Sequence, residues 1–398
     1  MSSSTARAQG AGETDAGSSA TAPGAILVDV ELRALVAAGS IRGARDIAPA
    51  QIQPASLDLR LGPKAHRVRA SFLPGVASME ERLATLSTST LDLGSADGAV
   101  LERGLVYLVQ LEETLELPPD LGVRFNPRSS AGRCDIFTRV LCPGHPRFDE
   151  APPGYCGPIW LEISPLSFPV RLRRGDRLCQ LRVHRGRPGL TTDELREVVA
   201  ETPLVFDGDR PLGPEETRFD DDGGLELNLG LRSRDPAGWR ASLHTEVVEF
   251  SQEGAHDPDL FWEPVRAPGG RCILAPESFY IFASRERLRV PPHLAAEMLP
   301  VDIGIGELRN NYAGFFDNGF GWREDAEGRP GGNGTPAVLE VRAHDVPFLV
   351  EDGQVFFRLK FFRASARPQH LYGQDRQGAS YQRQDLTLAR AFRKPPSE

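Results

Sequence analysis

A short polar turn, Pro127 to Arg133, carries the residue types that could hold an anion. It reads PRSSAGR, in which Arg128 offers a forked donor and Ser129 and Ser130 offer small hydroxyl groups. Backbone N–H groups in such a turn can approach a ligand closely because no bulky side chain intervenes. These groups suit a phosphate chain. From residue type alone, an ordinary polar β-turn with a surface arginine is the favoured interpretation, because motifs this short carry little information.

Glu162 stands inside an otherwise apolar strand pattern, GPIWLEIS. Ile159, Leu161 and Ile163 would share one face of that strand, which leaves Glu162 on the other face. If the other face is open, Glu162 is a solvated strand residue. If it lines a cleft, burial would raise the pKa of the carboxyl, a nearby Arg133 would offset that rise, and the group would suit a general base. The pattern leaves both possibilities open.

The chain repeats itself in register. Tyr107 matches Tyr280, and the match continues to Pro127 and Pro300, each pair 173 positions apart. After an insertion, Glu162 matches Glu340 at a spacing of 178. A spacing of this length is too great for a solenoid repeat and predicts a tandem duplication of one domain.

The repeat and the composition predict four parts: a disordered tail (1–24), a β-domain with the PRSS turn and Glu162 (25–186), a linker with a short helix (187–222), and a degenerate second copy of that β-domain (223–398). Asp29 is expected to cap a helix that ends at Gly39, and Thr192 to cap the linker helix. Asp58 alternates with leucines in a strand, which predicts that it faces solvent.

Composition favours a mostly β protein, since glycine (40) and proline (33) are frequent and no long helical pattern occurs. A net charge of −9 argues against a nucleic-acid polymer as partner. No apolar run is long enough for a membrane span, and no signal peptide is visible. Five cysteines without a CxxC pair suit reduced thiols. We therefore expect a cytoplasmic protein that does not bind membranes.

Four ordered blocks resemble the dCTP deaminase family, within the trimeric dUTPase-like superfamily: PASLDLRLG, PRSSAGR, GYCGPIWLEI and LYGQDRQGASY. The doubled length resembles the family's long, two-domain form. The resemblance implies a distorted jelly-roll β-barrel in each copy, with sites between barrels. It also implies hydrolytic deamination of dCTP to dUTP and ammonia within dUTP and dTTP precursor synthesis, with Mg²⁺ riding on the triphosphate. Zinc is not expected, because His244-Thr245-Glu246 lacks the cysteine pair of the zinc deaminases.

The resemblance also assigns roles. Glu162 would be the general base that activates water, with Arg133 and Ser129 orienting it, and no protein-bound metal is implied. Substrate would be bound by the turn, by the neighbouring loop and by a C-terminal lid: Arg128, Ser130, Asp149, Tyr155, Tyr372, Gln374 and Gln377. Two departures stand out: the loop around Asp149 is longer than usual, and Leu371 replaces a lysine before the lid tyrosine.

The second copy reads PVDIGIGELR where the first has its arginine and serines, yet it keeps Glu340. We expect it to serve as a structural partner that lends its C-terminal tail. The competing hypothesis is a composite site in which Glu340 is active. Two functional alternatives remain, a bifunctional enzyme that releases dUMP and a non-catalytic nucleotide-binding regulator. We further expect a homo-oligomer and allow for a nucleotide feedback effector.

Overall fold

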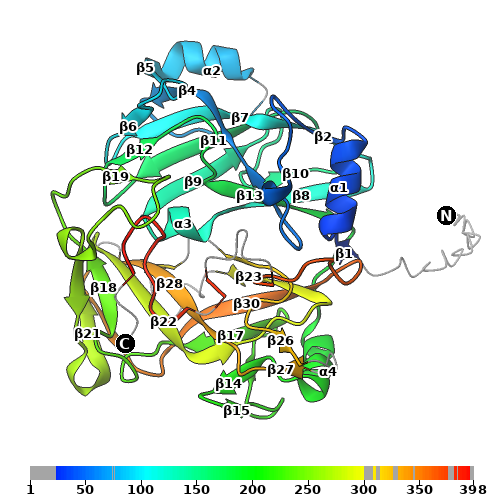
Figure 1. The fold of residues 1–398 in the computed structure, drawn as a ribbon, viewed down its shortest axis with the longest axis vertical. Helices are drawn as coiled ribbons and strands as arrows, with labels where there is room; N and C mark the ends of the chain where they lie inside the picture. Colours follow the sequence, from blue (N-terminus) through cyan, green and yellow to red (C-terminus); the bar gives the residue numbers. More distant parts are fainter. Residues whose placement is uncertain are drawn as a thin grey trace, which may run out of the picture.

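The computed structural model describes residues 24–73, 75, 77–299, 308–310, 314–325, 330–343, 346–374, 381–382 and 384–394. The expected tail falls outside these ranges, apart from Gly24. The chain folds into two β-rich halves, one above the other in Figure 1. Strands dominate and helices are few and short, so the mostly β prediction is confirmed. Within the described part of the chain, no helix is long and apolar enough to cross a membrane.

The first half contains three helices and one 3-10 turn: α1 (Asp29–Ala37), α2 (Met79–Leu86), α3 (Ser129–Gly132) and η1 (Pro49–Gln51). Its strands are β1 (Ala25–Ile26), β2 (Ile41–Gly43), β3 (Leu57–Leu59), β4 (Leu61–Val68), β5 (Ser87–Asp92), β6 (Ala99–Leu101), β7 (Val106–Glu116), β8 (Leu121–Pro127), β9 (Ile136–Leu141), β10 (Glu150–Ala151), β11 (Cys156–Pro165), β12 (Val170–Leu172) and β13 (Cys179–Arg185). One sheet has the order β1-β13-β8-β10, and a second has β5-β4-β7-β11-β9.

The second half contains α4 (Thr192–Glu201), η2 (Pro258–Leu260) and η3 (Pro268–Gly270). Its strands are β14 (Val205–Asp207), β15 (Arg210–Pro211), β16 (Arg218–Phe219), β17 (Gly224–Asn228), β18 (Gly238–Ala241), β19 (Val248–Glu249), β20 (Trp262–Val265), β21 (Arg271–Leu274), β22 (Phe279–Leu288), β23 (Leu294–Leu299), β24 (Leu308–Asn310), β25 (Phe315–Phe316), β26 (Arg323–Glu324), β27 (Pro330–Gly331), β28 (Thr335–Ala343), β29 (Phe348–Glu351) and β30 (Val355–Arg363). The sheet β16-β17-β30-β23-β25 packs with one that runs β15-β14-β22-β18-β20 and adds β28 and β24.

The repeated sequence segments form equivalent strand pairings in the two copies. Glu162 on β11 lies opposite Leu108 on β7. Glu340 on β28 lies opposite Ile281 on β22, and positions 108 and 281 are again 173 apart. The two glutamates therefore hold the same place in the two copies, and only their surroundings can distinguish them.

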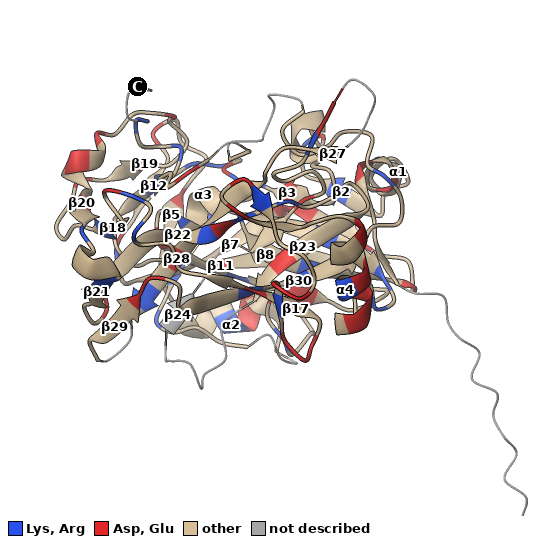
Figure 2. Cartoon of the chain, turned by 90° about the horizontal axis from the view of Figure 1, so that it is seen from below, with Lys and Arg blue, Asp and Glu red and all other residues tan. Residues whose placement is uncertain are grey.

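The two halves share a core and a sheet. One continuous apolar cluster joins Val140 and Phe168 of the first half to Trp262 and Phe392 of the second. Strand β19 of the second half pairs in parallel with β12 of the first. Figure 1 places α3 at the junction, above β28. Basic and acidic residues are both scattered over the two halves in Figure 2.

Several local expectations need adjustment. Val28 is the N-cap of α1 and Asp29 is its first helical residue, while Thr191, rather than Thr192, caps α4 by accepting from the N–H of Glu194 at 3.4 Å. The expected linker also contributes structure, because β14 pairs with β22 and β16 pairs with β17. Neighbouring threonines cannot be told apart as caps from sequence, since either hydroxyl could reach the first turn.

Candidate active site

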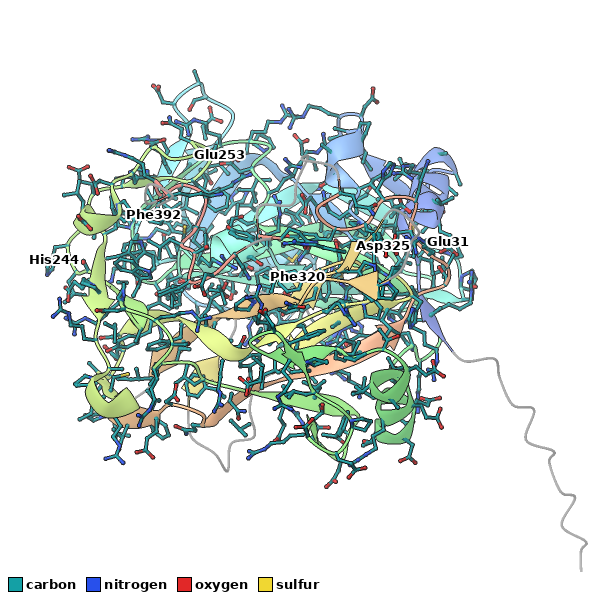
Figure 3. The ribbon with its side chains drawn as sticks, turned by 60° about the horizontal axis from the view of Figure 1, so that its bottom comes forward. Glu31, His244, Glu253, Phe320, Asp325 and Phe392 are labelled. Atoms are coloured by element: carbon teal, nitrogen blue, oxygen red, sulfur yellow. The ribbon has the colours of Figure 1, made fainter. Side chains whose placement is uncertain are left out.

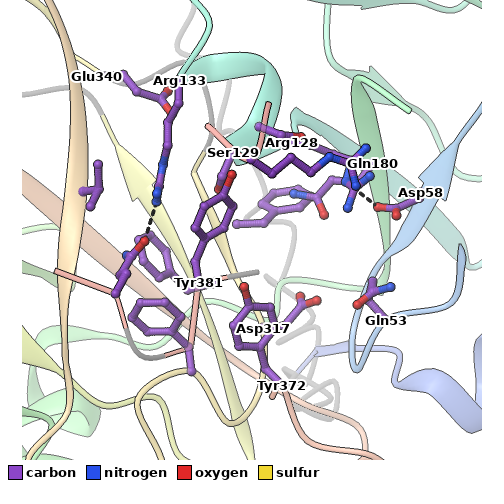
Figure 4. A pocket seen from close by; sticks show the side chains of 17 residues that line it. Gln53, Asp58, Arg128, Ser129, Arg133, Gln180, Asp317, Glu340, Tyr372 and Tyr381 are labelled. Atoms are coloured by element: carbon purple, nitrogen blue, oxygen red, sulfur yellow. Dashed lines mark hydrogen bonds and ion pairs between the residues drawn. The ribbon is translucent and has the colours of Figure 1, made fainter. Parts of the chain in front are cut away.

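A pocket opens at the junction of the two halves and draws its walls from both (Figure 4). Its cavity volume is about 70 Å³, well below the roughly 300–1,000 Å³ of most small-molecule sites, so the pocket is a narrow cavity between the two halves. From the first half it is lined by Gln53, Asp58, Arg128, Ser129, Ser130, Arg133 and Gln180, and from the second by Phe315, Phe316, Asp317, Phe320, Val338, Glu340, Tyr372, Tyr381, Gln384 and Arg390.

The PRSS turn forms one wall. Arg128 has an extended backbone and precedes α3, whose small residues Ser130, Ala131 and Gly132 are all buried. The Nε of Arg128 lies 3.1 Å from a carboxylate oxygen of Asp58, which is itself 1 % exposed. The expectation that Asp58 faces solvent is therefore wrong. Burial raises the pKa of Asp58, and the positive charges of Arg128 and Arg177 oppose that rise.

Glu340 packs directly on the turn. A Cβ atom added to Gly132 would lie 2.2 Å from one carboxylate oxygen of Glu340 and 2.4 Å from the other. Only glycine leaves room for this approach. Figure 4 shows Glu340 beside the start of the Arg133 side chain, whose guanidinium extends away from the carboxylate and donates to Gln384. The charge of Glu340 also helps burial to raise the pKa of the Cys134 thiol. The carboxylate thus comes from the second copy and the arginine from the first.

The pocket wall holds hydrogen-bond donors that the described chain does not satisfy. Five buried donor atoms of the lining have no hydrogen-bond partner among the described residues: Nη1 of Arg128, Oγ of Ser130, Nε of Arg133, the hydroxyl of Tyr381 and Nε of Arg390. Buried donors are normally paired, so a cluster of unpaired ones calls for an explanation. Three of the five belong to guanidinium groups, which pair best with phosphate or carboxylate oxygens.

Asp317 forms another wall and ties the two copies together. Its carboxylate accepts from Nη2 of Arg182 at 2.8 Å and from the hydroxyl of Ser56 at 2.9 Å. Arg182 is 2 % exposed and Asp317 is 6 % exposed, so this ion pair is buried between the halves. Both carboxylate oxygens are engaged. Asp317 therefore shapes the pocket while its charge is already neutralised.

Glu162 lies elsewhere. It is not among the residues that line the pocket. Its carboxyl is 2 % exposed and takes a hydrogen bond from Ser71, and Arg139 lies opposite it on β9. The surrounding apolar cluster includes Trp160 and Leu83 of α2. Burial raises the pKa of Glu162, and Ser71 and Arg139 oppose that rise. The predicted carboxylate is thus buried as envisaged, but away from Arg133 and Ser129.

Of the residues predicted to bind substrate outside the PRSS turn, one lines the pocket and the other described ones do not. Tyr372 lines the pocket, whereas Asp149 and Tyr155 do not. Asp149 accepts from the N–H of Val140 at 2.7 Å, and burial raises its pKa to about 6. Tyr155 donates to the carbonyl of Pro158 at 2.7 Å. Gln374 is exposed and bonds only to the nearby Leu371 among the described residues. Gln377 lies outside the described residues.

Sequence reasoning missed about half of the pocket. Phe316, Asp317 and Phe320 belong to the FDNGFG segment of the second copy, for which the sequence predicted no role. Gln180 lies opposite Asp58 in the pairing of β13 with β3, a register that alternation within either strand does not predict. Tyr381 ends the LYGQDRQGASY block, which predicted a lid but gave this tyrosine no role, whereas Gln384 and Arg390 follow in an irregular polar tail in which no periodicity marks them.

The fold and site together define a class: two β-barrel copies in one chain that build a composite, arginine-rich pocket between them. Family models agree with this division. Residues 23–187 match the 2'-deoxycytidine 5'-triphosphate deaminase N-terminal domain, and residues 191–392 match the C-terminal domain of the same family. The chain belongs to the dCTP deaminase family.

Individual relatives point the same way. The crystal structure of 2'-deoxycytidine 5'-triphosphate deaminase from Agrobacterium tumefaciens is 42% identical, with a TM-score of 0.77, over 87% of this chain and 99% of that one. A "dCTP deaminase, dUMP-forming" from Dictyoglomus thermophilum is 35% identical over 136 residues, 33% of this chain. A "dCTP deaminase" from Natronomonas pharaonis is 34% identical over 132 residues. The chain spans 64% and 65% of these two curated relatives.

Proposed function

We propose that the chain deaminates dCTP hydrolytically in the pocket between its two copies, giving dUTP and ammonia. The proposal rests on the contact between the Glu340 carboxylate and the PRSS turn, whose residue types suit an anion. Glu340 packs on Gly132 within the PRSS turn, whose Arg128 and Ser130 hold buried donors without partners. A triphosphate would satisfy those donors, and the carboxylate stands at the end of the turn where a base is needed.

In this reaction water adds to C4 of the cytosine ring, and the C4–N4 bond then breaks to release ammonia. Glu340 would take a proton from the attacking water and return one to the leaving nitrogen. Arg133 and Ser129 would orient the water and the base, since both line the pocket beside Glu340. Holding the nucleophile and ring in an attack geometry supplies much of the rate. This assignment adopts the composite-site hypothesis, with Glu340 in the role first predicted for Glu162.

Phosphate binding falls to the first copy and to the tail of the second. Arg128 and Ser130 would bind phosphate oxygens, and Mg²⁺ would enter as part of the substrate. Arg390 is a further pocket arginine with a buried unpaired nitrogen among the described residues. We also propose that the reaction needs no zinc, because neither histidine nor cysteine lines the pocket in the described part of the chain.

The alternative product is dUMP, which the name of the Dictyoglomus relative supports. That reaction needs a carboxylate to activate water against the α-phosphate. The loop aspartate in this pocket is Asp317, and Arg182 and Ser56 already engage both of its oxygens. We therefore propose dUTP as the final product.

A product assay tests both statements. The full chain is incubated with Mg²⁺ and separately with dCTP, CTP and dUTP, and ammonia, pyrophosphate and nucleotides are measured. We expect ammonia and dUTP from dCTP, and no pyrophosphate from either dCTP or dUTP. Pyrophosphate with dUMP would support the bifunctional alternative. Binding of dCTP without ammonia release would refute deamination and support a nucleotide-binding regulator.

A further inference from the structure

The C-terminal strap, which we define as residues 381–382 and 384–394, crosses the pocket between two anchors that both lie in the second copy. Gln382 fixes its beginning: its side chain donates to the carbonyl of Gly319 at 2.9 Å and accepts from the N–H of Gly321 at 3.1 Å. Phe392 fixes its end, with its ring centroid 5.4 Å from that of Phe261 and 5.7 Å from that of Trp262. Figure 3 shows that this end of the strap, at Phe392, lies well away from Phe320, which lines the pocket.

Between these anchors, Gln384 joins the two walls of the pocket. Its Oε1 accepts from Nη2 of Arg133 at 2.6 Å, and its Nε2 donates to the carbonyl of Pro336 at 3.0 Å. Pro336 lies on β28, the strand that carries Glu340. Gln384 is only 8 % exposed. One amide side chain therefore connects the arginine of the first copy to the glutamate-bearing strand of the second.

The rest of the strap also surrounds the Arg133 guanidinium. Nη1 of Arg133 donates to the carbonyl of Thr387 at 2.9 Å, and its Cζ lies 3.8 Å from the centre of the Tyr381 ring. Arg133 is 3 % exposed. Each of these partners belongs to the strap, although α3 sets the position of the arginine backbone. The direction in which the guanidinium points is thus determined by residues more than 240 positions away.

We propose that Gln384 is a positioning residue that aims Arg133 at the reacting centre. The inference rests on the proposed function for its catalytic consequence, but the clamp itself is a statement about the free protein. A planar guanidinium carries only N–H donors, so it needs acceptors on more than one side to hold a single orientation. Gln384 and Thr387 each supply one acceptor, and the aromatic ring of Tyr381 packs against the face of the guanidinium.

The test compares Gln384→Ala and Gln384→Glu with the control Asp385→Asn. Asp385 is the next strap residue, is exposed, and pairs with Arg234 instead of Arg133. In Gln384→Ala we expect kcat for ammonia release to fall by about tenfold to a hundredfold, the loss typical when a hydrogen bond to a charged group is removed. KM should change far less. Gln384→Glu keeps an acceptor for Arg133 but loses the donor to the Pro336 carbonyl, so it should restore only part of kcat, while the control should match the wild type.

A second readout does not depend on turnover. Phenylglyoxal labelling of Arg133, followed by peptide mass spectrometry, reports how firmly the guanidinium is held in the nucleotide-free chain. Labelling should be slow in the wild type and the control and markedly faster in Gln384→Ala. Unchanged labelling and unchanged kcat would overturn the clamp, as would a loss of kcat with unchanged labelling. Faster labelling in a chain whose wild type releases no ammonia would support the clamp and refute the proposed function instead.

Discussion

Gly132→Ala isolates the contact that defines the site. The new methyl group would sit 2.2 Å from a Glu340 oxygen, whereas ordinary van der Waals contact begins near 3.4 Å, so the carboxylate must retreat by 1.2 Å (3.4 − 2.2). A misplacement of about 1 Å at a reacting centre can cost about a hundredfold in rate. Gly132 lies in α3 and its backbone has no positive φ, so alanine adds crowding without backbone strain.

Steady-state ammonia release from dCTP measures the effect. We expect kcat to fall by about a hundredfold while the free energy of unfolding drops by only about 1–3 kcal/mol, the usual cost of overpacking. Gly213→Ala is the matched control, because its Cβ would meet nothing within 4 Å. In the double variant with Glu340→Asp, the shorter side chain withdraws the carboxylate, and the unfolding free energy should recover. Wild-type kcat in Gly132→Ala would refute the placement of Glu340 at the turn.

Three further predictions concern buried charges. Glu340→Gln should lower kcat by about 10²–10⁴-fold, the usual contribution of a general base, and Glu162→Gln should leave it near wild type; the reverse result would return the base to the first copy. Asp149 is protonated more readily in the folded state, with a pKa raised from 3.8 to about 6, so it favours folding at low pH and that benefit disappears as pH rises through 6. At about 1.36 kcal/mol per pKa unit, urea unfolding at pH 7 should show Asp149→Asn to be more stable by up to about 3 kcal/mol, and an unchanged pH profile would contradict this. Arg182→Met should cost about 3–5 kcal/mol by stranding its buried aspartate partner, whereas Arg185→Met, which removes an exposed pair, should cost less than about 1 kcal/mol.

Local sequence patterns predicted many of the strands. Alternating leucines predicted strands at β3 and β4, and the repeat of Tyr107 at Tyr280 placed equivalent strands in both copies. The PRSS turn was also recognisable, because its arginine and two serines are neighbours in sequence, although residue type did not separate an anion site from an ordinary polar turn. These features depend on neighbours in sequence, which a single chain displays directly.

The choice between the two glutamates could not be made locally. Glu162 and Glu340 share one strand pattern, and only the packing of one copy on the other decides which carboxylate reaches the turn. Asp58 was misplaced for the same reason: alternation identified its face correctly, but that face meets Arg128. Gln384 had no signal, because its contacts with Arg133 arise from a tail without periodicity.

The peptide link between the copies changes how the site responds to dilution and to mutation. Because the Gly132 and Glu340 walls belong to one chain, each meets the other at a fixed effective concentration, and the activity of each chain should not decline as protein is diluted. Each of these two walls is also supplied by one copy alone. The chain can lose the arginine and serines from its second copy, and bury Glu162 in its first, without damaging the wall that the other copy supplies.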